Sequence, residues 1–324
     1  MRCAPRRRQT GTKGKRQPNA SMSTPSSVGP MAGAKPMTME DGSMAVPRCS
    51  FENSSIIMMM ENDITTPANR WASPRRCAIA APTIMMAKKE ATRRMTSIHS
   101  ELEAVADPAY RRFQTKLIPT VDPERVLGVR VPVLRTYAKH LQRERPEIAD
   151  AFLRSLPHET YDENMLHGIL LNELPSYDAC VSALDAFLPH VDNWAVCDVL
   201  APRAFRKRPP HLLEQAKRWI ASSHPYTVRF GVGVLMRQYL DDGFSVDHLR
   251  TVAAIDSEDY YVRMMIAWYF ATALTKQWDA TIPLIEEGAL PLWTHNKAIQ
   301  KARESYRVPA DRKSILASLK RPTR

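Results

Sequence analysis

Trp194 and Asp198 lie four residues apart, and they are the side chains of this sequence best placed to do chemistry together. On an α-helix, residues i and i+4 lie one above the other on the same face. The pair would therefore present an indole ring and a carboxylate side by side. Because a carboxylate stabilises positive charge and an indole face attracts it, the pair is suited to stabilising a transient cation.

Two later helical segments add an arginine and a second tryptophan to this set. Arg229 lies near the start of one segment, and Trp268 ends the run 261–268 of another. An arginine near a carboxylate and two aromatic rings favours a substrate that carries phosphate and develops positive charge as it reacts. We therefore take Asp198, Trp194 and Trp268 as candidate catalytic residues. Arg229 is a candidate phosphate ligand.

Each candidate also has a purely structural interpretation. Tryptophan is highly buried on average, so Trp194 and Trp268 could be core aromatics. Asp198 lies among apolar residues of the segment 196–200, where a buried carboxylate needs a partner. A salt bridge to Arg229 is therefore the alternative to a reactive carboxylate in a cleft. The residues alone leave both interpretations open.

The candidate residues fall within a long succession of amphipathic helical patterns that begins after Met95. Turn signals rich in proline and glycine separate these patterns, and no segment shows strand alternation bounded by hairpin turns. Helices are expected at 97–118, 131–143, 146–154, 161–173, 177–188, 193–200, 210–221, 225–239, 246–255, 259–275, 278–287, 291–306 and 311–319. The pattern predicts one all-α domain over residues 95–324, large enough to bury a continuous core.

A spacing of 34 residues underlies the second half of this domain. Arg229, Arg263 and Lys297 are separated by this interval, and each lies near the start of a predicted helix. Such periods are typical of HEAT-like stacked helix pairs, which form a curved α–α superhelix, or solenoid. The three cations would then line one concave face and contact phosphates. The alternative is that three helix starts coincide. Gly231 and Gly233 lie inside a helical pattern, which favours close helix packing over a phosphate-binding loop.

Residues 1–94 differ from the rest of the chain in composition. The whole sequence has a formal net charge of +12, and this tail holds 16 Lys and Arg against 6 Asp and Glu. Residues 95–324 therefore hold 30 basic and 28 acidic residues, so their overall charge does not by itself indicate nucleic-acid binding. The tail has no Leu, Tyr or His, although it holds 11 of the 16 Met. Without leucine it is unsuited to forming a packed core, and we expect it to be disordered.

Three interpretations of this tail remain open. Its basic, acid-poor start could be a transit peptide or a nuclear localisation signal. It could be a disordered arm that tethers the protein to DNA. It could also be non-native upstream sequence, with translation starting at Met95. We favour the third hypothesis, because helical patterning begins directly after Met95, with Thr96 and Ser97 suited to capping the first helix.

Cysteines and short motifs argue against a bound metal or nucleotide. The five cysteines form no CxxC pair, and the sequence has no HExxH motif, no clustered His and Cys ligands and no Walker-type loop. The apolar run 55–60 is too short to span a bilayer. We therefore expect no metal, no cofactor and no membrane association, in a reducing intracellular setting.

Taken together, residues 95–324 resemble the AlkD-like family of DNA alkylation repair glycosylases, which has a HEAT-like helical-repeat fold. No single motif is diagnostic, but their order and spacing are specific. The motifs are Tyr-Arg-Arg-Phe at 110–113, Gly-Val-Arg-Val-Pro-Val-Leu-Arg at 128–135, the W-x-x-x-D helix with Trp194 and Asp198, the Val-Arg helix with Arg229, the V-R-x-x-x-x-W helix with Trp268, and the closing Lys-Ala-Ile at 297–299 with Tyr306. The resemblance does not extend to residues 1–94.

This resemblance implies a role for each matching residue. Asp198 would be the catalytic carboxylate, and Trp194 and Trp268 would pack against the deoxyribose of the damaged nucleotide. Arg229 would hold a phosphate. Ala195 stands where some relatives have a polar or acidic residue. That departure leaves Asp198 in place and bears on the substrate range.

The resulting hypothesis is a monofunctional DNA glycosylase that hydrolyses the N-glycosidic bond of cationic purines alkylated at N3 or N7. The resemblance implies double-stranded alkylated DNA as the partner, bound on a concave face. It also implies a monomer in the cytoplasm, acting at the nucleoid as in bacteria. The alternative is a non-catalytic helical-repeat scaffold that binds DNA or a protein through the same face. Asp198 discriminates between them, because a surface that only binds phosphate is better without a negative charge.

Overall fold

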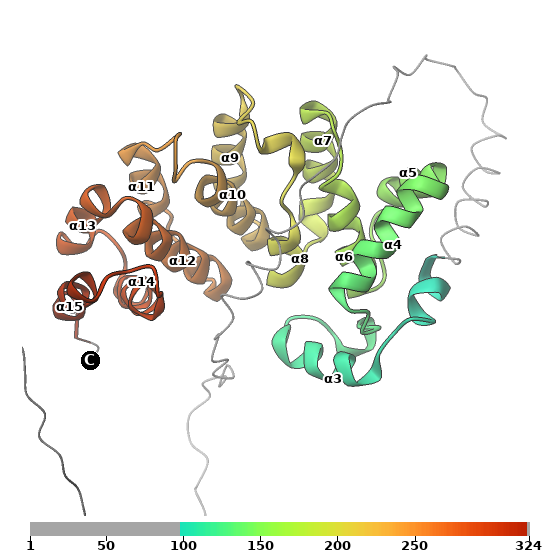
Figure 1. The fold of residues 1–324 in the computed structure, drawn as a ribbon, viewed down its shortest axis with the longest axis horizontal. Coiled ribbons are helices and arrows are strands. Elements are labelled where there is room, and N and C mark those ends of the chain that lie inside the picture. Colours follow the sequence, from blue (N-terminus) through green and yellow to red (C-terminus); the bar gives the residue numbers. More distant parts are fainter. Residues whose placement is uncertain (1–97, 323–324) are drawn as a thin grey trace, which may run out of the picture. The chain divides into compact units, whose positions relative to one another are not determined.

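All regular secondary structure in residues 98–322, the part of the chain that the computed structural model describes, is helical (Figure 1). A first helical segment occupies 98–103. The α-helices that follow are α3 (Pro108–Leu117), α4 (Val131–Glu144), α5 (Pro146–Arg154), α6 (Tyr161–Leu171), α7 (Tyr177–Phe187), α8 (Trp194–Val199), α9 (Leu212–Ile220), α10 (Pro225–Gln238), α11 (Val246–Ala253), α12 (Tyr260–Lys276), α13 (Trp278–Glu286), α14 (Leu292–Glu304) and α15 (Ala310–Ser318). Short 3-10 helices lie between some of them: η1 (Pro123–Arg125), η2 (Leu188–His190) and η3 (Arg203–Phe205). The predicted all-α class is confirmed. The expected disorder of 1–94 and the proposed start at Met95 lie outside the described residues.

The sequence pattern located the helices well, with one error. From α4 onward, the predicted segments agree with the observed helices to within about two residues at each end. The single helix predicted over 97–118 is wrong, because two helices occupy this range. The first of these ends at residue 103. Asp107 caps α3, since its Oδ1 accepts the backbone N–H of Ala109 at 2.8 Å and of Tyr110 at 3.1 Å. Pro108 then occupies the first turn of α3, where its missing N–H carries no penalty.

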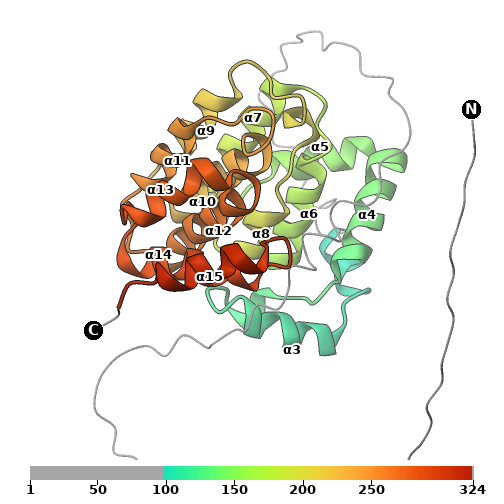
Figure 2. The ribbon, with the colours of Figure 1, turned by 60° about the vertical axis from the view of Figure 1, so that its left-hand side comes forward.

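Alternate helices form a continuous row through the fold. Each of α4, α6, α8, α10, α12 and α14 packs against the next member of this series. The other helices flank the row: α5 and α7 pack on α6, α9 on α10, α11 and α13 on α12, and α15 on α14. Figures 1 and 2 both show α9, α11 and α13 along one edge of the row. In such an arrangement each helix pair buries its apolar surface against its neighbours.

Two helices of this row, α6 and α10, lie in the interior of the fold. Every residue of α6 is buried, as are the consecutive residues 226–236 of α10. A helix that is covered on all sides must satisfy its polar groups internally. The buried polar residues of α6 and α10 therefore need hydrogen-bond or ion-pair partners within the protein.

Gly231 explains how α9 and α10 approach one another. A Cβ added at Gly231 would lie 2.9 Å from the carbonyl oxygen of Ala216 and 2.9 Å from the backbone nitrogen of Ile220, both on α9. Backbone atoms cannot move aside as a flexible side chain can. The predicted role of this glycine in close helix packing is confirmed.

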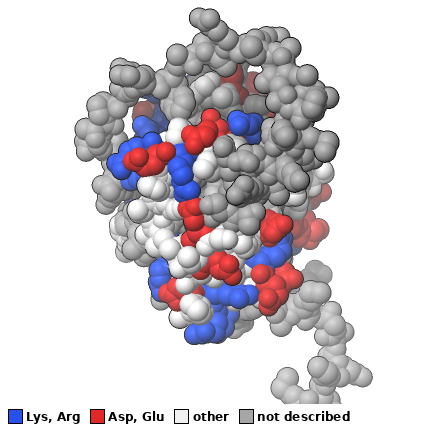
Figure 3. Space-filling view, turned by 90° about the vertical axis from the view of Figure 1, so that its right-hand side faces the viewer, with Lys and Arg blue, Asp and Glu red and all other residues white. Residues whose placement is uncertain are grey.

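Charged side chains on the N-terminal face of the described residues are mixed in sign. Figure 3 shows Lys and Arg interspersed with Asp and Glu on this face. Ion pairs in the N-terminal part of the described residues include Arg130 with Asp107 at 2.8 Å and Arg145 with Glu101 at 2.6 Å. This agrees with the nearly balanced charge of residues 95–324. No described helix is long and apolar enough to cross a membrane.

Candidate active site

The short helix α8 positions the two residues with which the sequence argument began. It starts at Trp194 because Asn193 caps it, with the Asn193 Oδ1 accepting the backbone N–H of Val196 at 2.9 Å. It ends where Leu200 adopts an extended backbone conformation. Trp194 and Asp198 are the first and fifth residues of this helix, so their predicted i, i+4 spacing on one helix is confirmed.

Asp198 forms a two-point ion pair with Arg229 of α10. The Arg229 Nε donates to Oδ1 at 2.9 Å, and Nη2 donates to Oδ2 at 2.7 Å. The side chain of Asp198 is 19% exposed, whereas that of Arg229 is 5% exposed. The salt bridge that the sequence offered as the structural interpretation of Asp198 is therefore present. The carboxylate nevertheless keeps an edge open to solvent, and each of its oxygens keeps a further lone pair.

Arg229 also connects α8 to α12. Its Nη1 donates to the carbonyl oxygen of Tyr261 at 2.8 Å. Burial lowers the pKa of Arg229, but the charge and hydrogen bonds of Asp198 outweigh this effect and hold the pKa above its usual value. The guanidinium is therefore permanently charged, and it fixes the orientation of the carboxylate from the protein side.

Trp194 is held by the N-terminal part of the fold. Its indole Nε1 donates to the carbonyl oxygen of Leu117, the last residue of α3, at 2.8 Å. A second link lies nearby: Arg125 Nη1 contacts Asp192 Oδ2 at 2.9 Å, and Arg125 Nε donates to the carbonyl oxygen of Glu159 at 2.8 Å. The segment leading into α8 and the half-buried ring of Trp194 are thereby fixed from outside the helix.

Trp268 occupies a different place in the row. It is half-buried on α12, which packs against α10 and α14. It lies seven residues after Tyr261, so the two share one face of α12. The structure thus brings Trp194, Asp198 and Arg229 together around α8, and it places Trp268 further along, on the helix that Arg229 reaches through the Tyr261 carbonyl.

Comparison with known proteins identifies the family of the chain. Residues 98–301 match a family model described as DNA alkylation repair enzyme, which is more than half of the chain. The protein belongs to the DNA alkylation repair enzyme family. The predicted resemblance to AlkD-like proteins is therefore confirmed. No curated protein and no solved structure matches the chain.

Arg263 and Lys297, the two later cations of the 34-residue series, lie within the residues that match the family model, and they are more accessible than Arg229. All three lie within the first two turns of their helices, α10, α12 and α14. Arg263 contacts the exposed Glu258 at 3.1 Å and lies 4.7 Å from the ring centroid of Trp293. Lys297 donates to Gln300 Oε1 at 3.2 Å. Both are half-exposed, so both are more accessible to a partner than Arg229, whose side chain is 5% exposed.

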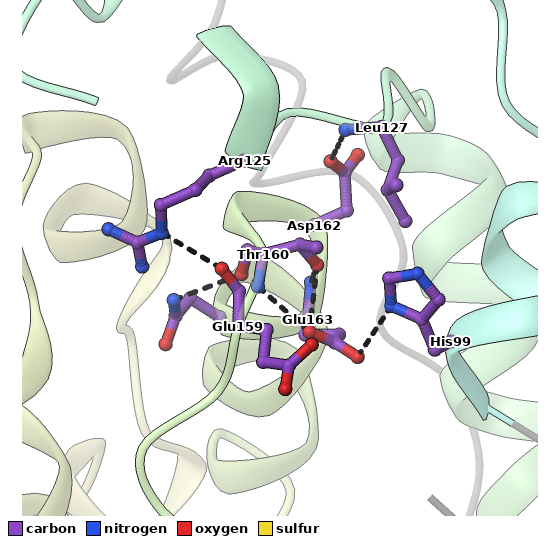
Figure 4. A network of polar contacts seen from close by, with 8 residues as sticks. His99, Arg125, Leu127, Glu159, Thr160, Asp162 and Glu163 are labelled. Carbon is purple, nitrogen blue, oxygen red and sulfur yellow. Dashed lines mark hydrogen bonds and ion pairs between the residues drawn. The ribbon is translucent and has the colours of Figure 1, made fainter. Parts of the chain in front are cut away.

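A buried carboxylate that the sequence argument missed organises the N-terminal part of this repair protein (Figure 4). Asp162 is completely buried, and it accepts the backbone N–H groups of Leu127 at 2.7 Å, Gly128 at 3.2 Å and Val129 at 2.7 Å. Burial raises the pKa of Asp162, and the three amides oppose that rise. Gly128 has φ +97°, and a Cβ there would lie 2.7 Å from the Arg111 Cβ. The segment before α4 is thus fixed onto α6.

The start of α6 shows the sequence signal that could have directed attention to this network. Thr160 and Glu163 form a capping box: the Thr160 Oγ1 accepts the Glu163 N–H at 3.2 Å, and Glu163 Oε2 accepts the Thr160 N–H at 2.8 Å. Glu163 Oε1 also lies 3.2 Å from His99 Nδ1 (Figure 4). The Thr-x-x-Glu pattern marks this helix start, but nothing in it identifies the partners of Asp162.

Neither of two surface hollows in the described residues adjoins Asp198. No group of three or more His, Cys, Asp or Glu side chains in residues 98–322 could hold a metal ion. These hollows lie beside His295 and Arg321 and beside Asp185 and Trp219. Asp198 lines neither of them. The charged and aromatic groups around α8 are the Asp198 carboxylate, the Trp194 ring and the Arg229 guanidinium.

Proposed function

We propose that this DNA alkylation repair enzyme is a DNA glycosylase that excises purines alkylated at N3 or N7. The observation that carries the proposal is the setting of Asp198. Its carboxylate is held at two points by the buried Arg229, it remains partly exposed, and Trp194 precedes it by one turn on the same helix. A charged group held in place before the reaction stabilises a developing opposite charge without reorganising.

The chemistry of such lesions suits this site. A purine alkylated at N3 or N7 is cationic, so it takes the electron pair of the glycosidic bond and leaves as a neutral base. Positive charge then develops on the deoxyribose as an oxocarbenium ion. Asp198 would stabilise that ion, and the rings of Trp194 and Trp268 would pack against the sugar. Water then adds to C1′, and Asp198 would orient it or accept its proton.

We further propose that the row of helices is a HEAT-like solenoid whose concave face binds double-stranded DNA. The alternation of row and flanking helices supports this, as do the half-exposed cations near the starts of α12 and α14. Arg263 and Lys297 would contact backbone phosphates. Arg229 would contribute through the two guanidinium hydrogens that neither Asp198 nor the Tyr261 carbonyl receives.

A second candidate function rests on the same ion pair. Because Arg229 neutralises Asp198 and links three helices, the pair would also serve a scaffold that binds DNA without cutting a bond. In that case the carboxylate would be needed for stability alone. The two functions therefore differ in what happens when Asp198 loses its charge but keeps its shape.

The test compares base release by the full-length protein with release by two matched variants. Asp198→Asn removes the charge at the candidate site. Asp185→Asn makes the same change on α7, where Asp185 accepts hydrogen bonds from Trp219 Nε1 at 2.7 Å and Arg218 Nη2 at 3.2 Å. Release of 7-methylguanine and 3-methyladenine from alkylated duplex DNA is measured, with DNA binding and folding followed in parallel.

We expect Asp198→Asn to lose about 100-fold or more in the rate of release while still binding DNA. Asp185→Asn should release base at the unchanged rate. Equal rates in all three proteins would contradict the role of Asp198. No release by the unchanged protein, with DNA binding intact, would favour the scaffold.

A further inference from the structure

A second arginine on α10 lies beside the Asp198–Arg229 pair. Arg229, Gly233 and Arg237 follow one another at i, i+4 and i+8, so they share one face of the helix. A Cβ added at Gly233 would lie 3.1 Å from Nη2 and 3.3 Å from Nη1 of Arg237. The guanidinium of Arg237 therefore folds back over Gly233, toward the turn of α10 that carries Arg229.

Arg237 also touches the end of α8. Its Nη2 donates to the carbonyl oxygen of Leu200 at 2.9 Å. Leu200 is the residue that ends α8, two positions after Asp198. A cation at this place interacts favourably with the last carbonyl groups of the helix. One of the three nitrogens of Arg237 is thereby engaged, beside the candidate catalytic carboxylate.

The remaining nitrogens of Arg237 are available to a ligand. Its Nε and Nη1 have no hydrogen-bond partner within residues 98–322, yet they are not among the buried atoms that lack one, so they reach solvent. No carboxylate of these residues lies within ion-pair distance of Arg237, and both oxygens of Asp198 are bound by Arg229. Arg237 is thus a half-buried cation without a counter-charge.

The surroundings of the pair carry an excess of positive charge. Asp198 and Arg229 cancel one another, and Arg237 adds one positive charge. Burial lowers the pKa of Arg237, the carboxylate of Asp198 raises it, and Arg229 lowers it further, so all three groups act on one another. Lys301 of α14 is a further cation without a carboxylate partner in the described part of the chain, and its pKa is lowered by burial and by the charges of Lys297 and Arg229. A polyanion can supply the missing negative charge.

We propose that Arg237 binds a DNA backbone phosphate beside the Asp198–Arg229 pair, and that Gly233 provides the space its guanidinium needs. The proposal rests on the proposed function in taking DNA as the anion. The two arginines of α10 then divide the work: Arg229 orients the carboxylate, and Arg237 holds the strand. A planar guanidinium with two free nitrogens matches the geometry of a phosphate group.

The test measures binding of undamaged duplex DNA by the full-length protein as a function of salt concentration. Each phosphate contact contributes about 0.9 to the slope of log affinity against log salt. We expect Arg237→Gln to reduce this slope by about 0.9 and to weaken binding about 10-fold at moderate salt. Arg237→Lys should keep most of the slope. The matched control is Arg250→Gln on α11, which removes an exposed arginine paired with Asp247 and should change neither quantity.

Gly233→Ala tests the same site without removing a charge. Alanine favours the helix, so the fold should be retained, but its Cβ would crowd the guanidinium of Arg237, which must shift by a few tenths of an ångström. We expect weaker binding of DNA with an unchanged thermal midpoint. If Arg237→Gln fails to fold because the Leu200 carbonyl loses its donor, Gly233→Ala and Arg237→Lys decide the matter.

An unchanged salt slope in Arg237→Gln would overturn the proposal and leave Arg237 as a cap of α8. Because undamaged DNA undergoes no chemistry, this result is separate from the glycosylase test. A protein that releases no base but loses salt dependence with Arg237→Gln would refute the proposed function and support the phosphate site.

Discussion

Asp162 and Asp198 are both aspartates bound by more than one N–H group, but they lie in different settings. Asp162 is completely buried and is bound by three backbone amides of the segment 127–129. Asp198 is bound by a single side chain, Arg229, and remains 19% exposed. A carboxylate surrounded by amides is enclosed by the fold, whereas one held by a side chain from behind can face a partner.

The two settings are connected through the chain between them. Asp162 fixes the segment 127–129 before α4. Arg125 and Leu117 precede this segment in the chain. Arg125 contacts Asp192, and the Leu117 carbonyl accepts the Trp194 indole N–H. The buried carboxylate of Asp162 therefore contributes to the position of α8, the helix that contains Asp198. The comparison separates residues that build the site from residues that act in it.

The largest expected effect on stability is at Asp162. Asp162→Ala would leave the buried amides of Leu127, Gly128 and Val129 without their acceptor. Each unsatisfied buried group costs about 1–3 kcal/mol, so we expect a loss of about 4 kcal/mol in the free energy of unfolding. Urea denaturation measures this. A loss below about 1 kcal/mol would show that water replaces the carboxylate and that Asp162 does not organise the segment.

Removing Arg229, the buried partner of Asp198, should lower the free energy of unfolding somewhat less. Arg229→Met removes the partner of Asp198 and leaves a carboxylate that is still four-fifths covered. We expect a loss of about 3 kcal/mol. The double variant Arg229→Met/Asp198→Asn should recover at least half of it, because no unpaired charge remains. Additive losses in this cycle would mean that the two side chains act independently.

The histidine pair on and beside α6 predicts how the N-terminal region responds to acid. His158 Nε2 and His167 Nδ1 are 2.8 Å apart, and the rings stack on Phe152 and Phe187. Burial lowers the pKa of His158 to about 4, and it lowers the pKa of His167 well below its ordinary value. In the unfolded chain a histidine binds its proton near pH 6.5. The neutral histidine pair therefore contributes its full stability to the folded state above pH 6.5, and this contribution is lost as the pH falls toward 4.

We expect a loss of about 2 kcal/mol from each histidine between pH 7 and pH 5. Unfolding by urea at the two pH values measures the loss. The variant His158→Gln should show a smaller difference between them, because it has one titrating group fewer. The charged or titrating groups that act on His158 and His167 from outside the pair, Glu163 and His190, remain unchanged in this comparison. The same loss in the variant would contradict the assignment.

The smallest expected losses of stability come from two helix caps. These caps distinguish the region around Asp162 from the region around Asp198. Thr160 caps α6, and Asn193 caps α8. Thr160→Ala and Asn193→Ala should each cost about 1 kcal/mol, since each removes one capping hydrogen bond. Only Asn193→Ala should also slow base release, because it loosens the helix that carries Trp194 and Asp198. Equal effects of both variants on base release would contradict the claim that α8, and not α6, positions the reacting residues.

Local patterns in the sequence were sufficient for the helices from α4 onward, and they offered the central ion pair as one of two interpretations of Asp198. Apolar periodicity and proline-rich turns located α4 to α15, since each depends on neighbouring residues. Asp198 stood out because a carboxylate inside an apolar helical segment needs a partner. The 34-residue spacing drew attention to Arg229, and the bidentate contact confirms that pairing.

What sequence reasoning missed depends on contacts between distant segments. Asp162 binds backbone amides about 35 residues earlier, and backbone groups leave no trace in side-chain patterns. Arg237 owes its place to Gly233 and to the carbonyl of Leu200, two features that no motif connects. The break before α3 was missed because the helical pattern continues through Asp107, although Pro108 marks a new start.

The central claim, that Asp198 stabilises positive charge on the sugar, is tested most directly with a charged mimic of that sugar. Duplex DNA carrying a cationic pyrrolidine in place of the damaged nucleoside is compared with DNA carrying the neutral tetrahydrofuran analogue. The account predicts that the full-length protein binds the cationic duplex at least about 10-fold more tightly, and that Asp198→Asn loses this preference while binding the neutral duplex as before. Equal affinity of the unchanged protein for both duplexes would contradict it.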